Sequence, residues 1–159
     1  AMRQVDAIAD GLAAADPANA AAYRANAAAY KDELARLDAR VAGMLAGLPD
    51  KRIITFHDAF PYYAARYAIE VVGVFQVFPG REPTPKRIAE LRALITAQGG
   101  RALFAEPQYS PKLLESMAAD LDVPVGVLDP MGTGEPSSDF YSQVALANAA
   151  ALVDALSDG

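Results

Sequence analysis

Residues 52–63, RIITFHDAFPYY, decide the fold of this chain. The apolar, β-branched run from Arg52 to Phe56 predicts a buried strand, and the residues that follow predict a helix with Pro61 in its first turn. Between them lies His57, the only histidine in the sequence. Open α/β sheets bind ligands at the carboxyl ends of their strands, and imidazole is the commonest metal-ligating side chain. A lone histidine near a core is more often a packed, hydrogen-bonded residue than a metal ligand, since clustered ligands define metal sites, so both roles stay open.

Strands and helices alternate along the rest of the chain. Short apolar segments predict four strands, and four segments with helical periodicity, three of them opened by proline, predict helices. Such alternation is typical of a parallel sheet covered by helices. We therefore expect an α/β fold, a four-stranded parallel sheet flanked by helices. The predicted strands are residues 52–57, 71–77, 102–105 and 125–128, and the predicted helices are residues 61–68, 85–98, 111–121 and 139–156.

A long helix is predicted before the sheet. After a helical segment at residues 3–15, Asp16 and Pro17 provide an N-cap and a first-turn proline, and no helix breaker follows until about Leu45. Its apolar residues fall on one face. The helix is about 45 Å long at 1.5 Å per residue, so we expect it to cross a domain or to link two domains. The predicted division is residues 1–48, with an amino-terminal helix and the long connector helix, and residues 49–159, an α/β lobe.

Composition bounds the classes of function. Hydrophobic residues make up 53% of the 159 residues, and the net charge is −6 without a cluster of lysine and arginine, which argues against nucleic-acid binding. Cysteine is absent from the sequence, which excludes disulfides, thiolate zinc sites and cysteine nucleophiles. No apolar run is long enough to span a membrane. The Ala1-Met2 start leads directly into a helical pattern, so we expect a fragment of a longer protein.

Polar side chains follow the predicted strands, whose carboxyl ends share one edge of a parallel sheet. His57 and Asp58 follow the first strand, Glu82 the second, Glu106 the third and Asp129 the fourth. An imidazole with several carboxylates suits Zn(II), Mn(II) or Fe(II). We expect Glu82 to be solvated. Other roles stay open for the rest: Asp58 as the cap of the next helix, Glu106 as a residue that orients a neighbouring ligand, and Asp129 as the start of a turn.

Catalytic signatures are missing from the sequence. It contains no dinucleotide fingerprint, phosphate-binding lysine loop, HExxH or GxSxG motif, and Ser110 is better explained as a helix cap than as a nucleophile. We therefore expect no enzymatic activity. One alternative is a small hydrolase-like α/β enzyme with His57 as acid or base and Asp129 or Glu106 as its partner. Another is an interaction module that binds through the long alanine-rich helix.

Four segments together resemble one protein family. They are residues 55–63 (TFHDAFPYY), 79–85 (PGREPTP), 104–110 (FAEPQYS) and 127–132 (VLDPMG). In this order and spacing they are similar to the zinc- and manganese-binding solute-binding proteins that serve ABC importers, the cluster A-I metal-binding family. The resemblance implies two α/β lobes joined by one long rigid helix, with metal bound in the cleft between the lobes. It identifies this chain as the carboxyl-terminal lobe with its connector helix.

The resemblance also implies a ligand set. The histidine of the HDAF segment, here His57, and the aspartate of the DP segment, here Asp129, are metal ligands in the family. Glu106 and Asp58 would orient these ligands without touching the metal. The family's other ligands are typically two histidines of the amino-terminal lobe, and this chain has no second histidine. We therefore expect an incomplete site that binds Zn(II) weakly or holds no metal. Histidine at position 57 favours zinc in this family, and Mn(II) is the alternative ion.

The implied partners are a divalent metal ion, the missing amino-terminal lobe and the membrane permease of an ABC importer. The implied location is periplasmic or otherwise extracytoplasmic. We expect no nucleic-acid partner. A lobe without its partner lobe exposes the face that met it, so we also expect that the fragment can form an artefactual homodimer through that face.

Overall fold

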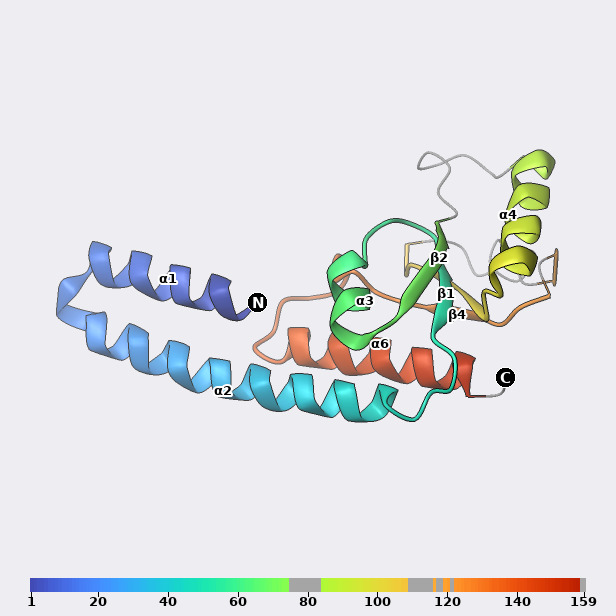
Figure 1. The fold of residues 1–159 in the computed structure, drawn as a ribbon. Helices are drawn as coiled ribbons and strands as arrows, with labels where there is room; N and C mark the ends of the chain where they lie inside the picture. Colours follow the sequence, from blue (N-terminus) through green and yellow to red (C-terminus); the bar gives the residue numbers. More distant parts are fainter. Residues whose placement is uncertain (75–83, 109–115, 117–118, 121, 158–159) are drawn as a thin grey trace. The chain divides into compact units, whose positions relative to one another are not determined.

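The computed structural model describes residues 1–74, 84–108, 116, 119–120 and 122–157 (Figure 1). The chain divides into two compact units, Ala1–Gly43 and Met44–Gly159. The division falls inside the long helix α2 (Ala20–Leu45), which continues from the first unit into the second. The domain boundary after residue 48 stays a prediction. In the part of the chain that the structure describes, no helix is long and apolar enough to cross a membrane.

The first unit is a pair of helices joined by a tight turn. Helix α1 (Met2–Ala15) is followed by the 3-10 turn η1 (Pro17–Asn19) and then by α2. The Asp16 carboxylate accepts hydrogen bonds from the Asn19 amide at 2.8 Å and the Tyr23 hydroxyl at 3.0 Å, and these bonds lower the pKa of Asp16. The long helix thus starts with a 3-10 turn. Asp16 is the N-cap of this turn and Pro17 its first residue, as the sequence predicts, although the Asp16 side chain makes no capping hydrogen bond.

The second unit contains the four-stranded parallel sheet that the sequence predicts (Figure 1). The strands lie in the order β2-β1-β3-β4, and every neighbouring pair is parallel. Strand β3 is buried along its whole length, with β1 on one side and β4 on the other. The strands are β1 (Arg52–Thr55), β2 (Glu70–Val74), β3 (Ala102–Ala105) and β4 (Val125–Val127).

Some sequence predictions differ from these bounds. Strand β1 ends at Thr55, so His57 lies beyond the last residue of the strand rather than inside it. Residues 75–77 of the predicted second strand lie outside the described residues. The same holds for Glu82, for Ser110 and for most of the predicted helix at 111–121.

Helices pack against the sheet. Helix α4 (Pro85–Gln98) contributes Ile95 to a core cluster with Ile54 and Leu103 from the two central strands. Helix α6 (Phe140–Leu156) contacts β4 and buries one face, and the short helix α3 (Pro61–Tyr67) contacts β2. Figure 1 shows α4 and α6 on different sides of the strands. His57 and Asp129 follow the carboxyl ends of β1 and β4, outside these helices.

The pairing of β3 with β4 depends on a glycine. A Cβ atom on Gly126 would lie 2.5 Å from Cε1 of Phe104, its fully buried partner in the ladder. We expect Gly126→Ala to lower the free energy of unfolding by about 1–3 kcal/mol, because an overpacked core must shift its side chains. In the control Gly47→Ala, the new Cβ meets nothing within 4 Å, and we expect a change below about 0.5 kcal/mol. Urea unfolding followed by circular dichroism measures both, and equal stabilities would contradict the prediction.

Candidate metal centre

The parallel register brings two polar side chains together at the carboxyl edge of the sheet. Strands β1 and β3 pair Thr55 with Phe104. His57 lies two residues after Thr55 and Glu106 lies two residues after Phe104, so the two follow the strands at equal distances. The Nδ1 atom of His57 is hydrogen-bonded to Oε1 of Glu106, and Glu106 is only 4% exposed. The two predicted site residues are therefore direct neighbours, and their contact follows from strand register.

A third side chain completes this arrangement. Gln108 donates a hydrogen bond from Nε2 to Oε2 of Glu106 at 2.6 Å, so each oxygen of the buried carboxylate has a partner. A buried carboxylate is tolerated when it is satisfied in this way. The carboxylate on Nδ1 favours the tautomer that carries its proton there, in which Nε2 is the ring nitrogen with the lone pair. The sequence analysis assigns no role to Gln108, because it lies in the turn after Glu106, where strand alternation gives no signal.

Asp129 lies two residues beyond the end of β4. Its Oδ1 accepts the Gly132 N–H at 3.1 Å, and its Oδ2 accepts the Thr133 hydroxyl at 2.7 Å. The Asp129 carboxylate thus starts a turn, which is one of the roles that the sequence left open for it. Each carboxylate oxygen has two lone pairs, so one hydrogen bond per oxygen leaves room for a metal. The turn role and the ligand role are compatible.

The main chain of Asp129 is held from the last helix. Asn148, on α6 and 5% exposed, accepts the Asp129 N–H at 2.8 Å and donates to the Asp129 carbonyl at 2.8 Å. Sequence reasoning missed Asn148. It lies 19 residues after Asp129 in an alanine-rich helix, where no local pattern marks it.

The candidate donors at this edge are two side chains, His57 and Asp129, and not the full ligand set of a metal site. Strand β3 separates β1 from β4, so the backbones that carry His57 and Asp129 are about 10 Å apart at roughly 4.8 Å per strand. Among the described residues no group of three or more histidine, cysteine, aspartate and glutamate side chains lies close enough to hold a metal ion. One imidazole and one carboxylate fit Zn(II) or Mn(II) by donor type, but they are fewer than the four ligands of a typical zinc site.

Comparison with known proteins assigns the chain to a family. The family model described as "ZnuA: Zinc-uptake complex component A periplasmic" matches residues 1–155. The chain belongs to the ZnuA family. The high-affinity zinc uptake system protein ZnuA of Brucella suis is 36% identical over 151 residues, which cover 94% of this chain and 45% of that protein. The chain therefore spans less than half the length of this curated relative.

Solved structures of the ZnuA type share the fold. A crystal structure of ZnuA has a TM-score of 0.79 and 32% sequence identity, and the match covers 98% of this chain and 56% of that chain. The solute-binding protein FpvC from Pseudomonas aeruginosa, in complex with Mn²⁺, has a TM-score of 0.84 and 28% identity over 99% of this chain and 60% of that chain. The prediction of one lobe of a two-lobe binding protein, preceded by a long helix, is confirmed.

Asp58 departs from its predicted capping role. The N-cap of α3 is Phe60, no side chain caps this helix, and its first residue is Pro61. The capping prediction is wrong because the loop places two residues between Asp58 and the helix. Asp58 is exposed beside His57. That it orients His57 in this ZnuA-type site stays a prediction.

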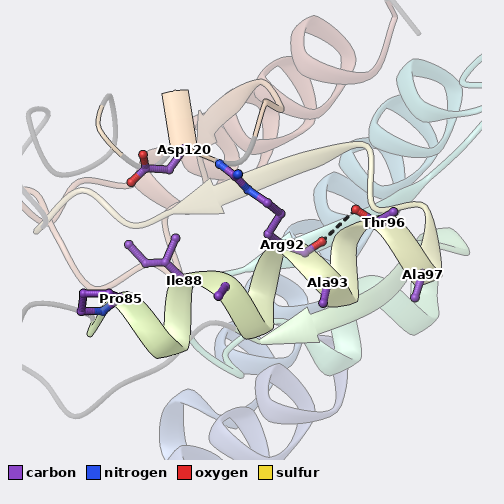
Figure 2. Close-up of a pocket in the computed structure, with 8 residues that line it drawn as sticks. Pro85, Ile88, Arg92, Ala93, Thr96, Ala97 and Asp120 are labelled. Carbon is purple, nitrogen blue, oxygen red and sulfur yellow. Dashed lines mark hydrogen bonds between the residues drawn. The ribbon is translucent and has the colours of Figure 1, made fainter.

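The hollow along α4 is separate from the candidate site. It has a volume of about 760 Å³ and is lined by one face of α4 together with Asp120. Figure 2 shows Arg92 and Asp120 beside it, with Thr96 hydrogen-bonded to the Arg92 carbonyl at 3.0 Å. His57, Glu106 and Asp129 do not line it. One carboxylate without an imidazole is a poor zinc donor set, so the sheet edge remains the candidate site of this ZnuA family member.

The contact with Glu106 predicts the tautomer of His57. We expect neutral His57 to carry its proton on Nδ1, and Glu106→Ala to shift the equilibrium toward the Nε2–H form because the acceptor is lost. Long-range ¹H–¹⁵N correlation spectra measure this directly, and a single histidine makes the signals unambiguous. Glu90→Ala, an exposed carboxylate on α4, is the control. A dominant Nε2–H form in the unmodified chain would contradict the prediction.

Proposed function

We propose that this chain is the metal-holding carboxyl-terminal lobe of a periplasmic solute-binding protein that delivers Zn(II) to an ABC importer. The observation that carries the proposal is the hydrogen-bonded chain from Gln108 through Glu106 to His57 in a member of the ZnuA family. Outer partners of this kind orient a metal-binding imidazole and fix its tautomer. Asp129, at the same edge of the sheet, is the proposed second ligand.

The donors suit half of a zinc site. Zinc binds imidazole nitrogen and carboxylate oxygen at about 2.0–2.2 Å and usually has four ligands in proteins. His57 and Asp129 supply two of them. We propose that the remaining donors come from the part of the parent protein that this chain does not span. The related Brucella protein, of which this chain covers 45%, is a high-affinity zinc uptake protein, which supports zinc as the cargo.

Manganese is the competing ion. FpvC, whose structure resembles this lobe, was solved in complex with Mn²⁺. Manganese favours oxygen donors, whereas imidazole suits zinc well. The imidazole of His57 is therefore the reason to propose zinc, and a strong preference for manganese would point to oxygen donors elsewhere in the parent protein.

A catalytic role is the weaker alternative. A histidine hydrogen-bonded to a carboxylate also matches a general base with its orienting partner. The ZnuA family, however, comprises binding components of zinc uptake rather than enzymes. We propose that the pair orients a ligand rather than transfers protons. The proposed partners are the zinc ion, a second lobe and the membrane permease. Self-association of the separate lobe is a further proposal.

Zinc titration tests the proposal on this chain, with calorimetry as the measurement and the His57 ring signals as an independent NMR readout. We expect weak 1:1 binding, at least tenfold weaker binding in His57→Ala and in Asp129→Ala, and far tighter binding by the intact parent protein, because half a ligand set leaves zinc incompletely coordinated. Glu70→Gln is the matched control, since Glu70 is exposed at the opposite edge of the sheet and should leave the affinity unchanged.

Two outcomes would contradict the proposal. One is tight 1:1 zinc binding that is unaffected by His57→Ala. The other is the absence of any zinc-dependent change in the ring signals of His57 at millimolar zinc.

A further inference from the structure

We propose that Asn148 is a positioning residue for the metal: it fixes the main chain of Asp129 and so sets the zinc affinity of a site that it does not touch. The inference rests on the proposed function, in which Asp129 is a zinc ligand. It adds a residue on a different element, α6, to the determinants of that site.

One side-chain amide holds both main-chain groups of Asp129. Asn148 donates from Nδ2 to the Asp129 carbonyl and accepts the Asp129 N–H on Oδ1, both at 2.8 Å. A reversed amide would set donor against donor and acceptor against acceptor, so the two bonds define a single orientation. Since Asn148 is 5% exposed, water does not readily replace either bond.

The sheet alone does not hold Asp129. The ladder beyond β4 ends where the Leu128 N–H donates to the Ala105 carbonyl at 2.8 Å. Pro130 follows Asp129 and has no N–H to donate. Met131 then adopts a φ of 66°, a left-handed conformation that costs free energy in a residue other than glycine. A turn with these two features needs an anchor before it, and Asn148 supplies that anchor.

The fixed main chain in turn fixes the carboxylate. The Gly132 N–H and the Thr133 hydroxyl hold one carboxylate oxygen each, and both belong to the turn that Asp129 starts. Their positions follow from the direction of the main chain at Asp129. If this peptide rotates, the carboxylate and its two partners move together. Loss of Asn148 therefore weakens zinc binding without removing a ligand.

A double-mutant cycle on the whole chain tests the inference. Zinc affinity is measured for the unmodified chain, Asn148→Ala, Asp129→Ala and the double variant. We expect Asn148→Ala to lower the zinc affinity about tenfold, which is within the range for residues that orient a metal ligand without touching the metal. The double variant should match Asp129→Ala, because Asn148 acts only through Asp129. Asn148→Ser takes the place of Asn148→Ala if the latter does not fold.

Two controls separate positioning from stability. Leu156→Ala removes a buried side chain of the same helix that lies beside residues 122–124, before β4, whereas Asp129 follows β4, so it lowers stability and should leave zinc affinity unchanged. Hydrogen exchange of the Asp129 amide should be faster in Asn148→Ala and unchanged in Leu156→Ala.

The outcomes distinguish this inference from the proposed function. Unchanged affinity in Asn148→Ala, or an equal loss with and without Asp129, overturns the positioning role and leaves the proposed function intact. No loss of affinity in Asp129→Ala overturns the ligand assignment itself, and the positioning role with it.

Discussion

The candidate site depends on the parallel pairing of β1 with β3. Because Thr55 lies opposite Phe104, the residues beyond the strand ends keep the same offset, and His57 meets Glu106. A slip of one residue along the ladder would turn one of the two side chains to the other face and separate them. Strand β3 is buried throughout and paired on both sides, so it resists such a slip. The register of the sheet thus places the imidazole beside Glu106, although His57 itself lies just after the end of β1.

Three polar side chains are buried among the described residues, and two of them hold residues at the carboxyl edge of the sheet. They are Thr55, Glu106 and Asn148. Burying an amide or a carboxylate costs free energy unless hydrogen bonds replace those to water, and two hydrogen bonds do so for each of Glu106 and Asn148. A well-packed apolar residue often serves stability as well as such a group does. The placement of Glu106 and Asn148 is therefore better explained by the orientation of His57 and Asp129 than by stability of the lobe.

The sequence predicts the sheet and its polar edge because these depend on local patterns. Apolar runs and first-turn prolines mark the elements, and parallel order brings the strand ends together. Asn148 follows no such pattern, since the segment 145–151, ALANAAA, differs from other buried helix faces only by one amide that packing brings to Asp129. The prediction that Asp58 caps α3 was wrong, because the exact length of the loop before Pro61 decides which residue is the N-cap, and no local pattern gives that length. Local sequence patterns specify the helices and strands, whereas contacts between distant elements specify how the candidate site residues are held.

In the proposed function, the ordered donors belong to a protein that binds a metal and later releases it. Donors that are fixed before the metal arrives add little ordering cost to binding. Two donors nevertheless leave zinc half-coordinated, so in the proposed arrangement one lobe alone binds weakly and a second lobe completes the tetrahedron. Affinity then depends on the distance between two rigid edges: it is high when they are close and low when they are apart, with no change inside either lobe. In the proposed arrangement, the rigidity that Glu106 and Asn148 give to the two proposed ligands would let lobe separation alone control release.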